Sequence, residues 1–552
     1  MGNSYLDKKP TNRVLTMNES DWARGITSQI LKVFPDKEVY TCAAGISPSG
    51  TVHFGNFRDI MTSFAVAKDL ARQGKKVRLL FSWDDFDRFR KVPANVDASF
   101  EKYVGTSLTA IPDPVGDCHV NYAQHFEQPF EDSMKDLGIE LEYRYQTHEY
   151  TSGRYDEQMI HALKARTKIA EILLSFMSEK GKEEKQIDPV KFTEEFYPIA
   201  VYSRFTGKDA TKILSYDGDS KITYQCLITK KEETIDIRTD HIVKLAWKMD
   251  WPMRWGEEGV VFEPGGFDHA SPGGSYDASA VIAREIFDVE PPVFAGYQFV
   301  GIRGIQGKMS GSKGNALSPG DLLEVYEPEI LMWLYFRKNP NQAFDLAFDT
   351  EIYRQYDEYD RAIAEVLEKG EESGFTRTFS FIGDMTHSKF KNPIPFKQAV
   401  ALGQIVQWDA NKVLEIASKL GTTYDSDSVS IRLLKAKAWL ETYNPEMMIR
   451  LRDTKNTEYV ATMSETAKEL IRKFHTFLQG ADTTKLSVEE IEEVVYGIPR
   501  VVGIAPEDLK KAQRAFFKDV YMLFIGQDTG PRLPTFIWAI DKNKLLGLLN
   551  VN

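Results

Sequence analysis

The feature that most constrains this chain is a strand, a turn, a helix and a second strand within residues 38–82. Residues 38–45 form an apolar run that ends at a glycine, and a turn rich in Ser, Pro and Gly follows. Residues 56–72 carry apolar side chains at helical spacing, and residues 77–82 are apolar again. Because strands joined through a helix lie parallel, the sequence predicts an α/β fold built on a parallel sheet.

The rest of the 552-residue chain is too long for one ordinary domain, and its patterns change along the sequence. Two long helical stretches follow residue 90, three short strands fall between 213 and 237, and strand signals return at 259–262 and 293–301 around a helix at 279–286. Beyond about residue 350 helical periodicity dominates. We therefore expect, in order, the first half of a Rossmann-like nucleotide-binding domain (20–90), a helical insertion (91–190), a small β meander (191–246), the second half of the nucleotide-binding domain (247–315), a helical junction (316–375) and an all-α domain (376–552).

Composition bounds the compartment and the partners. Cys42, Cys118 and Cys226 lie far apart, which argues against a disulfide framework and offers no CxxC metal pair. No apolar run approaches the roughly 20 residues of a membrane span, and no secretory signal is evident, so we expect a cytoplasmic protein that does not enter membranes. The net charge of −12 argues against a nucleic-acid partner. The argument is mild, because only the docking face of such a protein needs to be basic.

The turn after the first strand is the first candidate site. It includes Ser47, Ser49, His53, Gly55 and Asn56 and leads directly into the helix. Open α/β sheets bind ligands at the carboxyl ends of their strands, and a helix N-terminus offers free N–H groups to an anion. A phosphate site is therefore predicted. The segment on its own is equally compatible with a capped helix start and an incidental histidine.

A second candidate site is the segment 307–315, which is rich in Gly, Ser and Lys. Lys308 and Lys313 could reach a polyphosphate, and such a loop could close over a leaving group as charge develops. It is not a Walker loop, because Met309 follows the lysine where Ser or Thr is required. The alternative is a surface loop with two solvated lysines.

Together the two segments resemble the paired HIGH and KMSKS motifs of class I aminoacyl-tRNA synthetases, in the same order along the chain. At closer range the sequence resembles the class I lysyl-tRNA synthetase family. The resemblance is dense over 38–345 and only architectural beyond, and its motifs are residues 47–58, 251–255, 268–269 with 273–277, and 308–314.

This resemblance implies an ATP site. His53, Gly55 and Asn56 would hold the phosphates, and Lys308, Ser310 and Ser312 would act on the pyrophosphate side. The turn around Asp268 would bind the ribose. The full set implied for ATP is Ser49, His53, Gly55, Asn56, Gly266, Asp268, His269, Lys308, Met309, Ser310 and Lys313. Asn56 stands where the broad class often has a second His and Gly311 where it often has Lys, which leaves open whether Lys313 supplies the missing charge.

The resemblance also implies an amino-acid pocket. Its expected residues are Gly45, Ser47, Trp251, His269, Tyr276 and Tyr297. An alkyl stem fits against aromatic rings, whose faces attract an ammonium. A carboxylate should meet that ammonium, and Asp84, Asp85 and Asp277 are candidates that the sequence does not rank. We expect Trp247 and Trp255 to be structural.

The family activity would be activation of L-lysine with ATP and Mg²⁺, followed by transfer to the 3′-terminal adenosine of tRNA(Lys). The 91–190 insertion would be the connective region, 316–375 would contact the tRNA stem, and 376–552 would bind the anticodon. We expect a monomer. Relatives carry a cysteine-rich zinc ribbon, whereas Cys226 stands alone in the corresponding segment, so no metal and no structural zinc are expected.

Two alternatives remain open on sequence alone. A related synthetase for glutamate or glutamine would need a cationic or amide group in the pocket, which Arg254 or Arg303 could supply. A non-catalytic tRNA-binding paralogue is the other, although His53 and Lys308 are both retained. Either would share the predicted fold.

Overall fold

The computed structural model describes residues 12–14, 21–184, 186–270, 274–304, 317–382, 392–483, 485–501 and 503–551. The chain divides into two compact units. The N-terminal unit comprises residues 1–323, 328–346 and 369–385, and the C-terminal unit comprises residues 324–327, 347–368 and 386–552. Within the described ranges we find no helix with the length and apolarity that crossing a bilayer requires.

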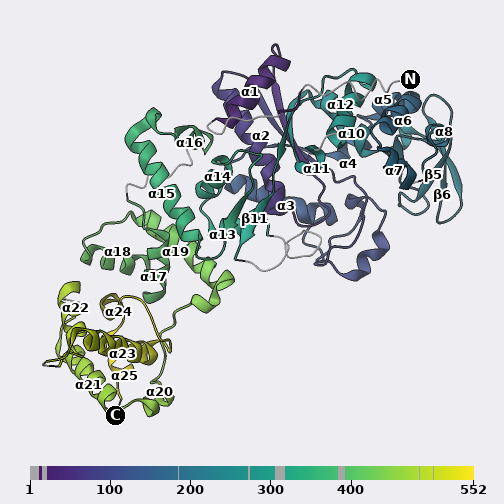
Figure 1. The fold of residues 1–552 in the computed structure, drawn as a ribbon. Coiled ribbons are helices and arrows are strands. Elements are labelled where there is room, and N and C mark those ends of the chain that lie inside the picture. The colour runs from purple at the N-terminus through teal and green to yellow at the C-terminus, as the bar shows by residue number, and fades with distance from the viewer. Residues whose placement is uncertain are drawn as a thin grey trace. The chain divides into compact units, whose positions relative to one another are not determined.

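The N-terminal unit is built on a five-stranded sheet of order β10-β9-β1-β2-β3, in which every described pairing is parallel (Figure 1). Its first two strands and the helix between them confirm the predicted βαβ unit. The first five residues of β1 are buried, as expected for a central strand covered on both faces. The strands are β1 (Tyr40–Ile46), β2 (Val77–Trp83), β3 (Glu142–Tyr145), β9 (Val260–Gly266) and β10 (Val293–Tyr297).

Helices cover this sheet. Helix α2 (Phe54–Arg72) connects β1 to β2 and packs on both strands, with α1 (Trp22–Val33) beside it. Helices α10 (Trp247–Glu258) and α12 (Ser275–Ile286) pack together against Ala43, Leu80 and Val260 of the sheet. Crossovers β1→β2 and β9→β10 step in opposite directions along the sheet, so right-handed connections place α2 and α12 on opposite faces. The fold is therefore α/β with both faces covered.

The segment between β2 and β9 differs from the helical insertion predicted for 91–190. Its strand β3 joins the main sheet, and its helices are mostly short. The predicted meander is confirmed as β5 (Thr211–Tyr216), β6 (Lys221–Cys226) and β7 (Glu232–Asp236). The remaining elements are η1 (Ala98–Tyr103), η2 (Leu108–Ala110), α3 (Tyr122–Asp136), α4 (Gln146–Thr151), α5 (Asp156–Lys164), α6 (Arg166–Ser175), α7 (Glu179–Glu184), α8 (Pro189–Glu195), β4 (Ile199–Val201), α9 (Ile237–Asp240) and β8 (Val243–Leu245).

The strand predicted at 293–301 is wrong as a single element. Strand β10 ends at Tyr297, and β11 (Val300–Arg303) pairs with β12 (Phe344–Ala347) in a separate two-stranded sheet. The apolar run is continuous in sequence, but its two halves are buried in different places. The other elements of this stretch are α11 (Phe267–Ala270), α13 (Pro319–Val325), α14 (Pro328–Phe336), α15 (Ile352–Lys369), η4 (Gly370–Glu372) and α16 (Thr376–Ile382).

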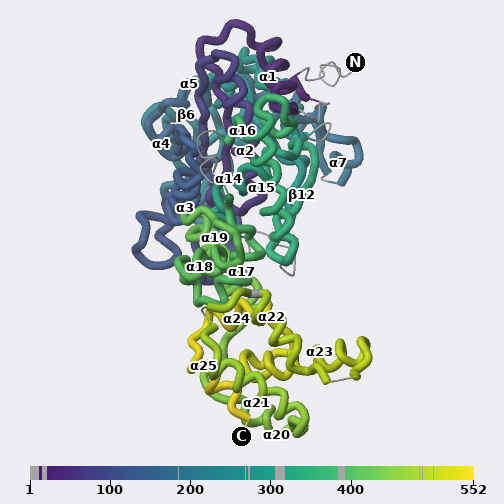
Figure 2. Tube along the Cα trace, turned by 90° about the vertical axis from the view of Figure 1, so that its left-hand side faces the viewer, coloured from purple at the N-terminus to yellow at the C-terminus, as the bar shows by residue number. Residues whose placement is uncertain are grey.

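The described part of the chain from residue 392 onward contains helices and no strand, as predicted (Figure 2). A buried arginine, Arg432, holds part of the C-terminal unit together by ion pairs to Glu327 at 2.8 Å and Asp360 at 2.6 Å. The helices are α17 (Phe396–Ile405), α18 (Ala410–Lys419), α19 (Ser426–Ala438), the π-helical turn η6 (Trp439–Tyr443), η7 (Pro445–Met447), α20 (Thr457–Thr462), α21 (Glu465–Gly480), α22 (Val488–Gly497), α23 (Pro506–Phe524), α24 (Leu533–Ala539) and α25 (Lys542–Leu548).

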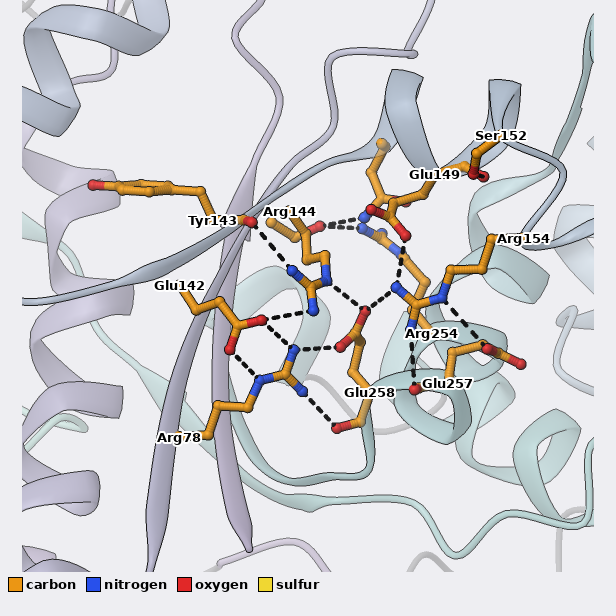
Figure 3. Close-up of polar contacts among 12 residues, drawn as sticks. Arg78, Glu142, Tyr143, Arg144, Glu149, Ser152, Arg154, Arg254, Glu257 and Glu258 are labelled. Carbon is orange, nitrogen blue, oxygen red and sulfur yellow. Dashed lines mark hydrogen bonds and ion pairs between the residues drawn. The ribbon is translucent and has the colours of Figure 1, made fainter.

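An ion-pair cluster closes the amino edge of the main sheet (Figure 3). Glu258, at the end of α10, pairs with Arg78 of β2 at 2.6 Å, Arg144 of β3 at 3.0 Å and Arg154 at 2.8 Å. Glu142 bonds the first two of these arginines in turn. We call these five residues the amino-edge network. It ties β2, β3 and α10 together at the end of the sheet opposite the candidate site.

Candidate active site

A cavity of about 460 Å³ opens at the carboxyl ends of β1, β9 and β10. Strand order reverses at β1, since β2 lies on one side of it and β9 on the other. Such a switch point leaves a crevice between the loops that leave the two neighbouring strands, which is where open α/β sheets bind ligands. We call this space the carboxyl-edge cavity.

Two carboxylates face each other in this cavity. Asp59 projects from α2 and accepts a hydrogen bond from the Gly45 N–H at 3.3 Å and one from the Tyr297 side chain. Glu263 projects from β9 and accepts from the Trp255 indole N–H at 2.6 Å. Burial, followed by the neighbouring Glu263, raises the pKa of Asp59 well above its usual value. Burial likewise raises the pKa of Glu263 to about 6.

The other carboxylates in the cavity wall already have cationic partners. Arg254 binds Asp84 at 2.7 Å and Asp250 at 3.2 Å, and Lys244 forms an ion pair with Asp87. Among the described residues, neither Asp59 nor Glu263 has a cationic side chain within 4 Å. A cationic ligand that enters the cavity would therefore meet, at these two positions, carboxyl groups that no protein cation pairs with.

The candidates named from sequence for the ammonium partner lie elsewhere or are occupied. Asp84 reaches the cavity but is matched by Arg254. Asp85 accepts a hydrogen bond from the Thr147 N–H at 2.7 Å and is not in the cavity lining. Asp277 is held in an ion pair with Arg13. The structure thus favours Asp59 and Glu263 over all three.

A second cavity of about 460 Å³ adjoins the first at Asn56 and contains the predicted phosphate site. Ser47, Ser49 and His53 line it together with Arg88 and other cationic side chains of the 88–91 segment. His53 caps α2, and its Nδ1 accepts from the Gly55 N–H at 3.0 Å. Burial lowers the pKa of His53, so the ring is neutral at pH 7 and its Nε2–H is left to donate to a phosphate.

Several predicted residues lie outside the described part of the chain. These are Lys308, Met309, Ser310, Ser312 and Lys313, and the side chain of Asp268. The chain that follows this loop is described, and the Leu317 carbonyl accepts a hydrogen bond from the Phe54 N–H at 2.9 Å. Leu317, two residues after the second motif, therefore lies beside the helix start of the first. Convergence of His53 and Lys308 on one nucleotide stays a prediction.

The remaining predicted residues are mostly gathered at the two cavities. Gly45, Gly266, Trp251, His269 and Tyr297 line the carboxyl-edge cavity. Tyr276 does not. It is fully buried, stacks on Phe294 with 4.2 Å between ring centroids, and donates its hydroxyl to the Pro292 carbonyl at 2.9 Å. Trp247, which we expected to be structural, lines the cavity and stacks on Trp251 at 5.2 Å.

Comparison with known proteins identifies the family. Residues 20–381 match the family described as tRNA synthetases class I (K). The lysine–tRNA ligase of Streptomyces coelicolor is 35% identical, covering 96% of this chain and 98% of that protein, and the lysine–tRNA ligase of Pyrococcus horikoshii is 34% identical, covering 96% and 99%. The chain belongs to the class I (K) tRNA synthetases.

A solved structure of a glutamate tRNA ligase from Elizabethkingia meningosepticum is also similar to this class I (K) synthetase. It has a TM-score of 0.45 and 14% identity, covering 93% of this chain and 99% of that chain.

The sequence reasoning missed Asp59 and Glu263 of this class I (K) synthetase, although both left a signal. Asp59 follows Asn56 by three residues, the spacing that places two side chains on one face of a helix. Glu263 interrupts the apolar run of β9, where an ionisable side chain needs a reason. Both signals are weak alone, because the sequence does not show that α2 and β9 are neighbours.

A cluster of metal-ligating side chains was also missed. Asp113, Cys118, His119 and His125 bring their ligand atoms within 4.8 Å of one another. The Cys118 sulfur lies 3.0 Å from His119 Nδ1 and 3.5 Å from His125 Nδ1, and Asp113 Oδ1 lies 3.2 Å from His125 Nδ1. Tetrahedral zinc places its ligand atoms about 3.3–3.8 Å apart, so these separations are within or slightly below that range, and one carboxylate, one thiol and two imidazoles are donor types that zinc takes. The signal was a short Asp, Cys-His, His spacing that a search for CxxC pairs overlooks.

This cluster is connected to the phosphate-site turn. Tyr122, at the start of α3 between His119 and His125, donates its hydroxyl to the Ser49 carbonyl at 3.0 Å. Its ring lies 5.0 Å from those of Phe89 and Phe126. The segment 113–125 therefore supports one wall of the second cavity.

Proposed function

We propose that this protein is a lysine–tRNA ligase, which activates lysine with ATP and transfers it to the 3′-terminal adenosine of tRNA(Lys). The observation that carries the proposal is the Asp59–Glu263 pair, two unmatched carboxylates in a cavity whose other acidic groups are already paired. A lysine ammonium supplies the missing charge. The names of the 32–35% identical relatives support the same assignment.

The substrate would lie with its ammonium between Asp59 and Glu263. Trp251 and Tyr297 offer aromatic surface for the alkyl stem. The amino acid's carboxylate would then point toward Asn56, where the two cavities meet. This orientation brings the nucleophile to the side of the helix start at which the ATP phosphates would bind.

In the first step a carboxylate oxygen of lysine attacks the α-phosphorus of ATP in line. The bond to the bridging oxygen breaks, and pyrophosphate leaves with its electron pair. Neutral His53 would donate a hydrogen bond to the phosphates, and Lys308 would stabilise the leaving group. Mg²⁺, when bound, would neutralise charge on the phosphates. In the second step a ribose hydroxyl of the terminal adenosine attacks the carbonyl carbon, and AMP leaves.

Specificity for glutamate or glutamine is disfavoured by the state of Arg254. Its guanidinium is committed to Asp84 and Asp250, so it cannot also bind a substrate carboxylate. Arg303 lies on β11 and is not in the lining of the carboxyl-edge cavity. The two raised-pKa carboxyls would in addition repel an acidic side chain.

The test is ATP–pyrophosphate exchange with each of the twenty amino acids, with and without total tRNA. Lysine should support exchange, and glutamate and glutamine should not. Exchange with glutamate but not lysine would overturn the assignment, and a lack of exchange with any amino acid under both conditions would favour a tRNA-binding paralogue.

We extend the proposal to a cytoplasmic monomer with a connective insertion (91–190), a stem-contact junction (316–375) and an anticodon-binding domain (376–552).

We also propose that Asp113, Cys118, His119 and His125 hold a zinc ion. The sequence-based expectation of no zinc rested on the meander, where Cys226 stands alone. The donor cluster in residues 113–125 is a different site, and there we propose zinc instead. Metal analysis should find one zinc per chain in the purified protein and none in Cys118→Ser/His125→Ala. Cys226→Ser is the matched control and should keep the metal. Wild-type protein purified without zinc after growth in zinc-supplemented medium would refute this site.

A further inference from the structure

The two cavities of the N-terminal unit share a boundary. The residues that line both cavities are Ile46, Asn56, Asp87, Arg88 and Arg90. Asp59 and Glu263 line only the carboxyl-edge cavity, whereas His53 and its helix start line only the second cavity. The boundary therefore separates the end of the site that suits an ammonium from the end that suits phosphates, and two of its residues are arginines.

The backbone at Phe89 fixes the direction of both arginines. The Phe89 N–H donates to the Thr106 carbonyl at 2.7 Å, and the Phe89 carbonyl accepts from the Gly105 N–H at 2.9 Å. The Phe89 ring is fully buried in an apolar cluster. Because successive side chains of an extended segment point to opposite sides, Arg88 and Arg90 project away from this cluster and toward the cavities.

The charge of Arg90 is available to a ligand, whereas the charges beside it are paired. Arg88 binds Asp209 at 3.0 Å, and Asp87 forms an ion pair with Lys244. Arg90 is exposed, and among the residues that the structure describes it has no carboxylate within 4 Å and no hydrogen-bond acceptor. Arg90 can therefore bind an anion at the boundary without breaking an ion pair.

Two anions have to meet at this boundary in the proposed reaction. The carboxylate of lysine would approach from the carboxyl-edge cavity, and the α-phosphate of ATP from the second cavity. Their repulsion opposes the attack, and the negative charge around the α-phosphorus is redistributed as the new bond forms. A guanidinium beside the reacting atoms lowers both costs, because its planar fork can donate to two oxygens at once.

We propose that Arg90 is a catalytic residue, which binds the α-phosphate of ATP in the transition state of lysine activation. The inference rests on the proposed function, since that function supplies both anions. Arg90 stays protonated throughout and transfers no proton. It would also supply positive charge that the second motif lacks, because Gly311 stands where the broad class often has Lys.

The direct test is lysine-dependent ATP–pyrophosphate exchange by the full-length protein with saturating tRNA. Arg90→Gln should lower kcat about 100- to 1,000-fold, the loss that follows removal of one group that stabilises a transition state. KM for lysine and KM for ATP should change less than about threefold, because the contact strengthens only in the transition state. Arg361→Gln makes the same change at an exposed arginine of α15 outside both cavities, and it should react as wild type does.

Two further variants separate catalysis from a structural role. Arg90→Lys keeps the charge but not the fork, so its kcat should fall between those of wild type and Arg90→Gln. Arg90→Ala leaves space at the boundary, and free guanidinium below denaturing concentrations should restore part of its lost kcat. Because Arg90 is exposed, the thermal midpoints of all three variants should match that of wild type.

A wild-type kcat in Arg90→Gln would overturn the proposal. A normal kcat at saturating tRNA with weaker tRNA binding would also overturn it, and would assign Arg90 to the tRNA. A lowered thermal midpoint with no recovery by guanidinium would assign a structural role and would overturn it as well. The proposed function fails in a different way, namely when the wild-type protein itself shows no lysine-dependent exchange.

Discussion

The two edges of the main sheet differ in whether their buried carboxylates have cationic partners. At the amino edge, Glu258 meets three arginines at 2.6–3.0 Å, and each of these arginines has at least one further carboxylate partner, Glu142, Glu149 or Glu257. At the carboxyl edge, Asp59 and Glu263 lie in a cavity with hydrogen bonds but no cationic side chain among the described residues within 4 Å. The same element types that build one edge also build the other, so the difference is in the side chains.

This contrast separates a stabilising device from a binding device. A matched network contributes to folding and leaves nothing for a ligand. An unmatched pair costs folding free energy, as the raised pKa values of both carboxyls indicate, and that cost is recovered when a cation binds. Substitutions at either edge test this difference.

The largest expected effect is at Asp59. Asp59→Asn should lower kcat/KM for lysine about 30- to 1,000-fold, because removing one partner of a buried charge pair costs about 2–4 kcal/mol. Its thermal midpoint should be unchanged or higher than that of wild type, since a desolvated carboxyl is lost. Near-normal lysine kinetics in a folded variant would show that the cation binds elsewhere.

The next effect is at the amino edge. Glu258→Gln should lower the free energy of unfolding by about 2 kcal/mol, because three partly buried arginines lose their shared partner. Denaturant unfolding measures this change, while kcat/KM for lysine at 25 °C should stay close to wild type. A selective loss of activity without destabilisation would contradict the division between the two edges.

A smaller effect is expected from pH. The pKa of Glu263 is raised to about 6, so the group is ionised at pH 7 and protonated at pH 5 in the free protein. The lysine ammonium binds the ionised form, and KM for lysine should therefore rise about tenfold as pH falls from 7 to 5. Glu263→Gln should flatten that dependence. A KM that falls on acidification would have the wrong sign for a cationic substrate.

The smallest effect concerns Tyr122, a positioning residue for the phosphate-site turn. Tyr122→Phe removes one hydrogen bond to the Ser49 carbonyl, which leaves the phosphate-site turn less firmly positioned. If the energy of that bond is lost from ATP transition-state binding, about 0.5–1.5 kcal/mol, kcat/KM for ATP should fall roughly 2- to 10-fold. KM for lysine should not change. An equal rise in both Michaelis constants would indicate a general loss of structure instead.

Much of the fold could be predicted because the pattern is local. The β1–α2–β2 unit, the meander and the helical C-terminal part follow from periodicities read within short windows. The break between Tyr297 and Val300 could not be predicted, because an apolar run has the same appearance whether it enters one sheet or two. Strand β3, only four residues long, has too little pattern to be found inside a helical region.

The residues of the candidate site also divide into those that a local pattern predicts and those that depend on contacts between distant segments. His53 and Asn56 belong to a motif that is contiguous in sequence, and the structure places both at the cavities. Asp59 and Glu263 become partners only after β9 pairs with β1, a contact between distant segments. Tyr276 was expected at the pocket from the family resemblance, which does not show that its ring turns into the core against Phe294. Non-local pairing is what a single sequence conceals.

The register of β1 has a consequence for how the protein is made. Thr41 pairs with Val260, so one side of the central strand stays open until the ribosome has synthesised the chain through β9. For that period an apolar strand presents unpaired backbone N–H and C=O groups to solvent, a condition that favours association with other chains. Biogenesis of this protein should therefore depend more on chaperone protection than its finished structure suggests.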